Sequence, residues 1–198
     1  LAEAARAAPP APPRPRAADL LLDALARRFT DGYVAAVHPL RRALEVVQQK
    51  EDIRWFWLAF FIASELWDDK TWEELATRQV EIARETGALA VLPLALAYRS
   101  GLHLHAGEFA ATAALIADAD ALTRAIRGAP LMYIQVLLAA WRGKRTEMSS
   151  LLEFGLQNAA DRGEGRALSW GDYANAVLHN GLGEYEAALD AALAACEH

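Results

Sequence analysis

Apolar residues recur along this chain with the spacing of an α-helix. Between residues 19 and 29 the leucines and Phe29 fall on one broad face, and between 34 and 50 the positions Val37, Leu40, Leu44 and Val47 are three or four residues apart. Such spacing places side chains on one face, because an α-helix has about 3.6 residues per turn. The segment 53–66 is apolar on nearly all sides, which predicts a helix packed between neighbours. No segment alternates apolar and polar residues for long enough to predict a strand, so the pattern predicts an all-α protein of about ten helices.

The breaks between these helices resemble one another and recur at a regular interval. A small or polar residue ends each helix, an aromatic residue usually follows within two positions, and an alanine-rich helix comes next. Measured from Gly32, Lys70, Gly107, Gly143 and Gly183, the intervals are 38, 37, 36 and 40 residues. This period is typical of helical-repeat proteins and is close to that of the tetratricopeptide repeat (TPR). It predicts a TPR-like α-solenoid of about five antiparallel helix pairs, wound as a right-handed superhelix.

Particular residue strings predict where helices begin and end. Thr71-Trp72-Glu73-Glu74 has the form of a capping box, which predicts a helix start at Thr71, and Ser169-Trp170-Gly171-Asp172 is a weaker example. Thr86-Gly87 predicts a helix end, because glycine readily adopts the left-handed conformation found there. Pro39 lies early in the 34–50 helix, so we expect the regular helix to begin near it.

The chain begins with a segment that differs in composition from the rest. Residues 8–16 read APPAPPRPR and hold five of the eight prolines, which predicts an extended linker. We interpret residues 1–16 as the end of a preceding helix and this linker, and residues 17–198 as the helical-repeat domain. The chain lacks an initial methionine, and its helical pattern continues through residues 189–198. We therefore expect a fragment of a longer protein.

Composition narrows the functional classes. The chain is 54% hydrophobic with a mean hydropathy of +0.06, values that fit neither a disordered chain nor a membrane-embedded bundle. Cys196 is the single cysteine, which excludes an intramolecular disulfide and favours the cytoplasm. The net charge is −6 and no basic stripe is present, so we expect no direct contact with nucleic acid. The longest apolar runs, residues 55–63 and 88–98, are far shorter than the ~20 residues that a membrane-spanning helix needs, so we expect no membrane association.

The sequence offers no convincing set of catalytic or metal-binding residues. Gly143-Lys144-Arg145-Thr146 lacks the serine or threonine directly after lysine that a nucleotide-binding loop requires, so we interpret it as a turn between helices. His103 and His105 are two residues apart, which places them on opposite sides of a helix and not on one chelating face. We therefore predict no catalytic residue, no metal site and no cofactor in this segment.

The aromatic residues are the strongest candidates for binding. Four of the six tryptophans lie between residues 55 and 72. Aromatic side chains bury large areas, so one interpretation is that they fill the core. The alternative is that aligned first helices present them along an inner groove for an apolar or peptide ligand. The candidate groove consists of Trp57, Phe60, Trp67, His105, Tyr133, Trp141 and Tyr173.

Four strings in the chain resemble a known family. They are Ala17–Arg42, Trp67–Arg84, Gly87–Gly107 and Ala174–Leu189. These strings look like the helical-repeat middle region of large ATP-binding LuxR-type transcription regulators, the MalT-like multidomain activators. The resemblance covers nearly the whole body and persists between the turns. It implies an N-terminal ATPase and a C-terminal helix-turn-helix domain outside this chain.

The resemblance implies a cytoplasmic, non-catalytic sensor segment. Such a segment would bind an inducer or a protein partner and relay the event to the ATPase and DNA-binding domains, and no family residue transfers to a position here. Three other readings stay open: a stand-alone adaptor that grips a peptide in its concave groove, an unrecognised all-α enzyme, and a segment that chiefly mediates self-association.

Overall fold

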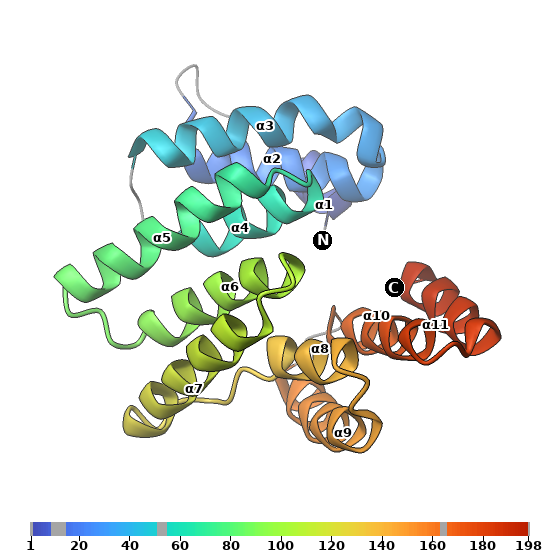
Figure 1. The fold of residues 1–198 in the computed structure, drawn as a ribbon. Helices are drawn as coiled ribbons and strands as arrows, with labels where there is room; N and C mark the ends of the chain where they lie inside the picture. Colours follow the sequence, from blue (N-terminus) through green and yellow to red (C-terminus); the bar gives the residue numbers. More distant parts are fainter. Residues whose placement is uncertain (1, 9–14, 51–54, 163–165, 198) are drawn as a thin grey trace. The chain divides into compact units, whose positions relative to one another are not determined.

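A computed structural model describes residues 2–8, 15–50, 55–162 and 166–197. These ranges contain eleven helices and no strand, which confirms the all-α prediction (Figure 1). The chain divides into two compact units, residues 1–98 (unit 1) and 99–198 (unit 2). The predicted linker lies largely outside the described residues. The helical body begins at Ala17, at the position expected from the sequence.

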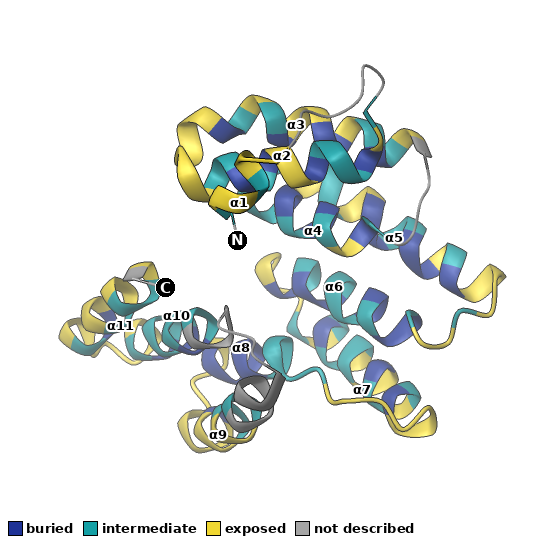
Figure 2. Ribbon diagram, turned by 180° about the vertical axis from the view of Figure 1, so that it is seen from behind, coloured by how far each residue is buried: buried dark blue, intermediate teal, exposed yellow. Residues whose placement is uncertain are grey.

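Unit 1 is built from consecutive helices that pack on their neighbours in the chain. Its helices are α1 (Ala2–Arg6), α2 (Ala17–Thr30), α3 (Tyr33–Lys50), α4 (Phe56–Glu65), α5 (Asp69–Glu85) and the first half of α6 (Leu92–His105). Helix α2 contacts α1 and α3, and α4 contacts α3 and α5. The core contains Leu21, Leu40, Val47 and Phe56, each at most 1% exposed. The helical spacing of leucine and valine in the sequence therefore corresponds to the buried face (Figure 2).

In unit 2, two helices each contact three others. Its helices are the end of α6, α7 (Phe109–Ala125), α8 (Tyr133–Trp141), α9 (Arg145–Arg162), α10 (Arg166–Gly181) and α11 (Tyr185–Glu197). Helix α8 contacts α7, α9 and α10, while α10 also contacts α9 and α11. Leu137, Met148 and Leu178 form part of its core. Gly171 permits close packing of α10 on α9, because a Cβ atom there would lie 3.0 Å from Leu152 Cδ1.

The helices end in a recurring turn. The second residue after the last helical residue has a positive φ in these turns, at Gly32, Trp67, Gly87, Gly107, Arg127, Gly143 and Gly183. In all but the first of these turns, two backbone amides bond back to carbonyls of the last helical turn, as with Gly143 N to Ala140 O at 3.0 Å and Lys144 N to Ala139 O at 2.8 Å. This pair of bonds is the Schellman motif, which satisfies carbonyls that the helix end leaves without partners.

The structure corrects three predicted helix boundaries. Helix α5 begins at Asp69 and is capped by Asp68, whose carboxylate accepts the Thr71 amide at 3.0 Å, so Thr71 is not the cap. The turn residue preceding it is therefore Trp67 and not Lys70. An aspartate is an effective cap because its charge also interacts favourably with the helix dipole. Ser169 lies inside α10, so it caps no helix.

Helix α3 begins at Tyr33 and continues through Pro39, contrary to the expectation that it begins near the proline. A proline inside a helix loses one backbone hydrogen bond and costs about 3 kcal/mol or more. The flanking residues Ala36 and Leu40 are 0% and 1% exposed, so burial of this face holds the helix together across the proline.

Candidate functional site

The seven candidate groove residues are divided between the two units. Trp57, Phe60 and Trp67 belong to unit 1, whereas His105, Tyr133, Trp141 and Tyr173 belong to unit 2. Phe60 is 2% exposed and stacks on Tyr98 with ring centroids 4.3 Å apart and planes inclined by 17°. For Phe60, the core interpretation left open by the sequence is therefore the one that its burial supports.

Trp67 is the most exposed aromatic candidate in unit 1. Trp67 lies in the turn between α4 and α5, is 83% exposed and has a φ of 52°. The Schellman bonds of this turn join Trp67 N to Ser64 O and Asp68 N to Ala63 O, so the backbone requires a left-handed residue here. A residue with a Cβ atom is strained in this conformation by about 1 kcal/mol or more. The turn thus presents a large indole to solvent at some expense in stability.

Trp57 offers a second exposed indole in unit 1. It lies on α4 and is 46% exposed, whereas Phe56, Ala59 and Ile62 on the same helix are buried. Because α4 is apolar on nearly all sides, the sequence pattern could not indicate which of its aromatic residues would remain outside. The structure assigns that position to Trp57.

Unit 2 contains a cluster of three aromatic rings. Tyr133 on α8 and Trp170 on α10 have centroids 5.9 Å apart, and Trp170 and Tyr173 have centroids 6.2 Å apart with planes at 84°. Burial raises the pKa of the Tyr173 phenol. Two predicted groove residues are therefore brought together by a third residue, Trp170, which the sequence analysis did not assign to the groove. Its spacing of three residues from Tyr173 on one helix is the signal that could have identified it.

A polar contact accompanies the packing of α7 on α8. Gln135 Nε2 donates to both carboxylate oxygens of Asp120, at 2.9 and 2.7 Å. Burial raises the pKa of the Asp120 carboxyl, while Arg124 and the Gln135 amide oppose that change. The pair therefore fixes the side chain of Gln135, two residues from Tyr133 on the same helix.

The remaining unit 2 candidates lie at helix ends. Trp141 is the last residue of α8 and is 46% exposed. His105 is the last residue of α6, and its Nδ1 lies 2.8 Å from the carbonyl oxygen of Gly101. This contact lies within the last turn of α6, so it explains the position of the His105 ring without a ligand.

Exposed aromatic residues that the sequence analysis did not select lie in unit 1 as well. Phe29 is 64% exposed and Tyr33 is 41% exposed, on either side of the α2–α3 turn. The guanidinium of Arg28 lies 5.9 Å from the Phe29 ring centroid and 5.7 Å from that of Tyr33. Arg28 also pairs with Glu65 on α4 at 2.8 Å. This turn therefore combines a positive charge with two aromatic faces.

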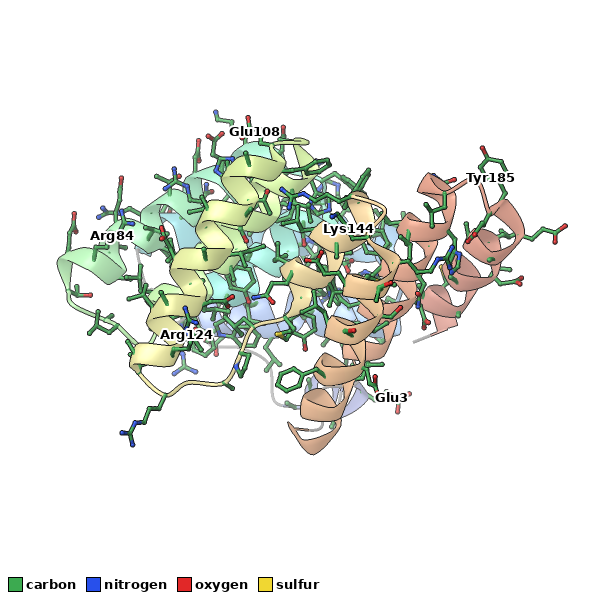
Figure 3. All side chains as sticks on the ribbon, turned by 60° about the horizontal axis from the view of Figure 1, so that its bottom comes forward. Glu3, Arg84, Glu108, Arg124, Lys144 and Tyr185 are labelled. Carbon is green, nitrogen blue, oxygen red and sulfur yellow. The ribbon has the colours of Figure 1, made fainter. Side chains whose placement is uncertain are left out.

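Two turns of unit 2 share a histidine–glutamate contact. His103 Nδ1 meets Glu108 Oε2 at 2.5 Å, and His179 Nδ1 meets Glu184 Oε2 at 2.6 Å. In both, the histidine precedes the left-handed glycine by four residues and the glutamate follows that glycine directly. Figure 3 shows Glu108 and Arg124 at opposite ends of α7, where their charges favour the helix dipole.

The second of these turns carries an additional arginine. Arg145 Nη2 donates to both carboxylate oxygens of Glu184 at 2.7 Å. The hydrogen bond from Arg145, followed by that from His179, lowers the pKa of the Glu184 carboxyl. The arrangement joins the starts of α9 and α11 through one carboxylate. The ion pair is about half exposed, so its contribution to stability is small.

Two properties of the described residues concern metal binding and the membrane. Within the described ranges, no group of three or more histidine, cysteine, aspartate or glutamate side chains could hold a metal ion. Among the helices described, none combines the length and the apolar content needed to cross a membrane. Gly143 and Lys144 lie in the turn between α8 and α9, as predicted, and Arg145 begins α9. The turn therefore follows a helix, whereas a nucleotide-binding loop follows a strand.

Comparison of the chain with protein-family models, with curated proteins and with solved structures found no match. Function is therefore inferred from the residues and from their geometry.

Proposed function

We propose that this chain is a TPR-like helical-repeat segment that binds a protein partner or a small-molecule inducer and catalyses no reaction. The observation that carries the proposal is the recurrence of one turn geometry, which is regularly spaced between residues 67 and 127. Left-handed residues stand at Trp67, Gly87, Gly107 and Arg127, twenty residues apart, and one helix with its turn fills each interval. A constant interval between turns of one geometry favours stacked helix pairs and a long binding surface.

Packing within unit 2 also supports the proposal. Helix α8 contacts its successor α9 and also α10, and α9 contacts α10. In stacked helix pairs, the first helix of one pair packs on the first helix of the next, and the second helix fills the space between them. Helices α8 to α11 have these contacts. The exposed indoles of Trp57, Trp67 and Trp141 supply the kind of side chain that anchors binding partners.

In the same proposal, the segment belongs to a MalT-like LuxR-type regulator of the cytoplasm. Support comes from the resemblance of the four sequence strings, among them 67–84 and 174–189. A solenoid can change curvature at modest cost because each repeat touches only its neighbours. A ligand that prefers one curvature would shift the attached ATPase and DNA-binding domains by as much as its affinity differs between the two forms.

Native mass spectrometry of the purified chain tests the binding role directly. An additional mass that disappears on denaturation would identify a bound inducer and provide the ligand for titration. The variants Trp67→Ala and Tyr133→Ala would then be compared with Phe29→Ala, an exposed aromatic outside the candidate groove. Unchanged affinity in the first two variants would refute the aromatic groove.

The stand-alone adaptor remains the second candidate because of Trp67. A strained and highly exposed indole is suited to insertion into a peptide or protein partner. The coding sequence on both sides of this segment separates the two candidates. Flanking ATPase and helix-turn-helix sequences would support the regulator, and their absence would favour the adaptor.

A further inference from the structure

Helix α11 presents its large apolar residues to solvent and turns its small ones toward the body. Tyr185, Leu189 and Leu193 are 71%, 60% and 58% exposed, whereas Ala188 is 8% exposed. The helix packs on α10, whose Leu178 is 1% exposed. An amphipathic helix normally buries its leucines, because burial of a leucine stabilises far more than burial of an alanine. Figure 2 shows this run of exposed positions along α11.

The exposed residues form one continuous stripe. Tyr185, Leu189 and Leu193 are four residues apart, and Ala192 and the exposed Cys196 fill the same face. The spacing of 185, 189, 192 and 196 alternates four and three residues, which is the spacing of a coiled-coil seam. From Tyr185 to Leu193 the stripe is about 12 Å long, at 1.5 Å per residue. Figure 3 shows Tyr185 projecting from the start of α11.

Charge along the stripe is of one sign. Glu186 and Asp190 are exposed and lie side by side along the border next to Leu193, at about 100° and 140° from Tyr185 around the helix. Helix α11 contains no lysine and no arginine. Within the part of the chain that the structure describes, neither acid has an ion-pair partner. The opposite border of the stripe lies beside Ala188, which is 8% exposed.

We propose that the α11 stripe is a docking site for an amphipathic helix of a partner protein, with leucine-type residues on its apolar face and lysine or arginine along one border. The apolar stripe supplies the buried contact, and Glu186 with Asp190 selects partners by charge and sets the direction of the helix. A second copy of this chain is a poorer occupant. In an antiparallel pair related by a two-fold axis, the same borders meet, so the acids of both copies would oppose each other.

This inference rests on α11 alone and goes beyond the proposed function, which concerns the aromatic candidates on earlier helices. Its test therefore fails or succeeds independently of that proposal. The probes are two hydrocarbon-stapled, fluorescent peptides of two heptads, both with leucine at the a and d positions. One carries lysine at the e and g positions, and the other carries glutamate there. Binding to the full chain is followed by fluorescence anisotropy.

The basic-border peptide should bind saturably. The affinity of the acidic-border peptide should be lower by a factor of about ten or more. The double variant Leu189→Ser with Leu193→Ser should weaken the basic-border complex about tenfold or more. Val34→Ser is the matched control, because Val34 is an exposed apolar residue of unit 1, 87% accessible. Both α11 leucines are exposed, so circular dichroism should show an unchanged fold.

The charge-reversed variant, Glu186→Lys with Asp190→Lys, separates docking from general stickiness. It should invert the preference, so that the acidic-border peptide becomes the tighter ligand. Equal affinity for the two peptides, no binding of either, or binding that ignores the leucine variants would overturn the proposal. A dimer of the unmodified chain in sedimentation that the leucine variants convert to a monomer would also overturn it and would assign the stripe to a second copy.

Discussion

The turn at Trp67 permits a test of backbone strain, because glycine should be more stabilising than alanine at this position, the reverse of their order within a helix. Trp67 has a φ of 52° and is 83% exposed, so replacing it by either residue removes nearly the same small buried area. The two variants therefore differ chiefly in the Cβ atom. A Cβ atom in the left-handed region costs about 1–2 kcal/mol, while glycine loses about 0.4–1 kcal/mol more through its freer unfolded chain. Trp67→Gly should accordingly be more stable than Trp67→Ala by about 0.5–1 kcal/mol.

Trp57 supplies the matched control for this pair. It lies inside α4 and is 46% exposed, and there alanine should be the better residue by about 1 kcal/mol. The order of the two substitutions should thus reverse between position 67 and position 57. The separation between the two differences should be about 1.5–2 kcal/mol.

Urea unfolding followed by circular dichroism at 222 nm is the suitable assay, because tryptophan fluorescence changes with the substitutions themselves. Midpoints are converted to free energies of unfolding only if the dependence on urea is the same for all four variants. The reasoning would be refuted if the alanine variant were more stable than the glycine variant at both positions, because the turn would then not require a left-handed backbone conformation.

Three further predictions concern the turns and the packing of unit 2. Gly107→Ala should destabilise by about 1 kcal/mol from its φ of 78° alone, since no atom lies within 4 Å of a Cβ there, whereas Gly181→Ala, equally open but within α10, should be neutral or stabilising; equal losses in urea unfolding would contradict this. The lowered pKa of Glu184 means that folding favours its ionised form, so this contribution to stability is complete above the unfolded pKa near 4.5 and is lost as the pH falls through the lower folded pKa. Thermal unfolding measured from pH 6 to pH 3 should show this loss of stability, and the Glu184→Gln variant should lack this part of the pH dependence. Gly171→Val should destabilise by about 1–3 kcal/mol, because its Cβ would lie 3.0 Å from Leu152 Cδ1, and a melting temperature equal to that of the unmodified chain would show that α9 and α10 are not packed this closely.

The sequence was sufficient to predict that the chain is helical and where some helices begin or end, but three predicted helix starts were wrong. The helical spacing of Leu40, Leu44 and Val47 corresponds to buried positions, and Thr86-Gly87 ends α5 as expected. The turn before α5 was misplaced by three residues, since a tryptophan there takes the conformation that glycine takes at Gly107 and Gly143. Pattern reasoning identifies left-handed turns by glycine, so it cannot find one that surrounding packing and capping impose on another residue.

The candidate site was less predictable because helical periodicity does not determine which face of an apolar helix is covered. In α4, Phe60 is buried and Trp57 is exposed, although both are large, aromatic and three residues apart. The pairing of Tyr133 with Trp170 joins two helices 37 residues apart in the sequence, and its geometry depends on how closely α8 and α10 approach. Spacing along one helix could have indicated only the Trp170–Tyr173 half of the cluster.

Helix α11 shows the same limit in its clearest form. Its sequence contains one stripe of alanine and another of tyrosine and leucine, and hydrophobicity alone would assign the leucine stripe to the core. The structure places Ala188 against the body and leaves Leu189 and Leu193 exposed. Alanine lets α11 approach α10 closely, so the large residues remain for a surface outside this pair. A helix that packs its small face inward therefore has two possible interfaces, and its leucines indicate the one that a partner would complete.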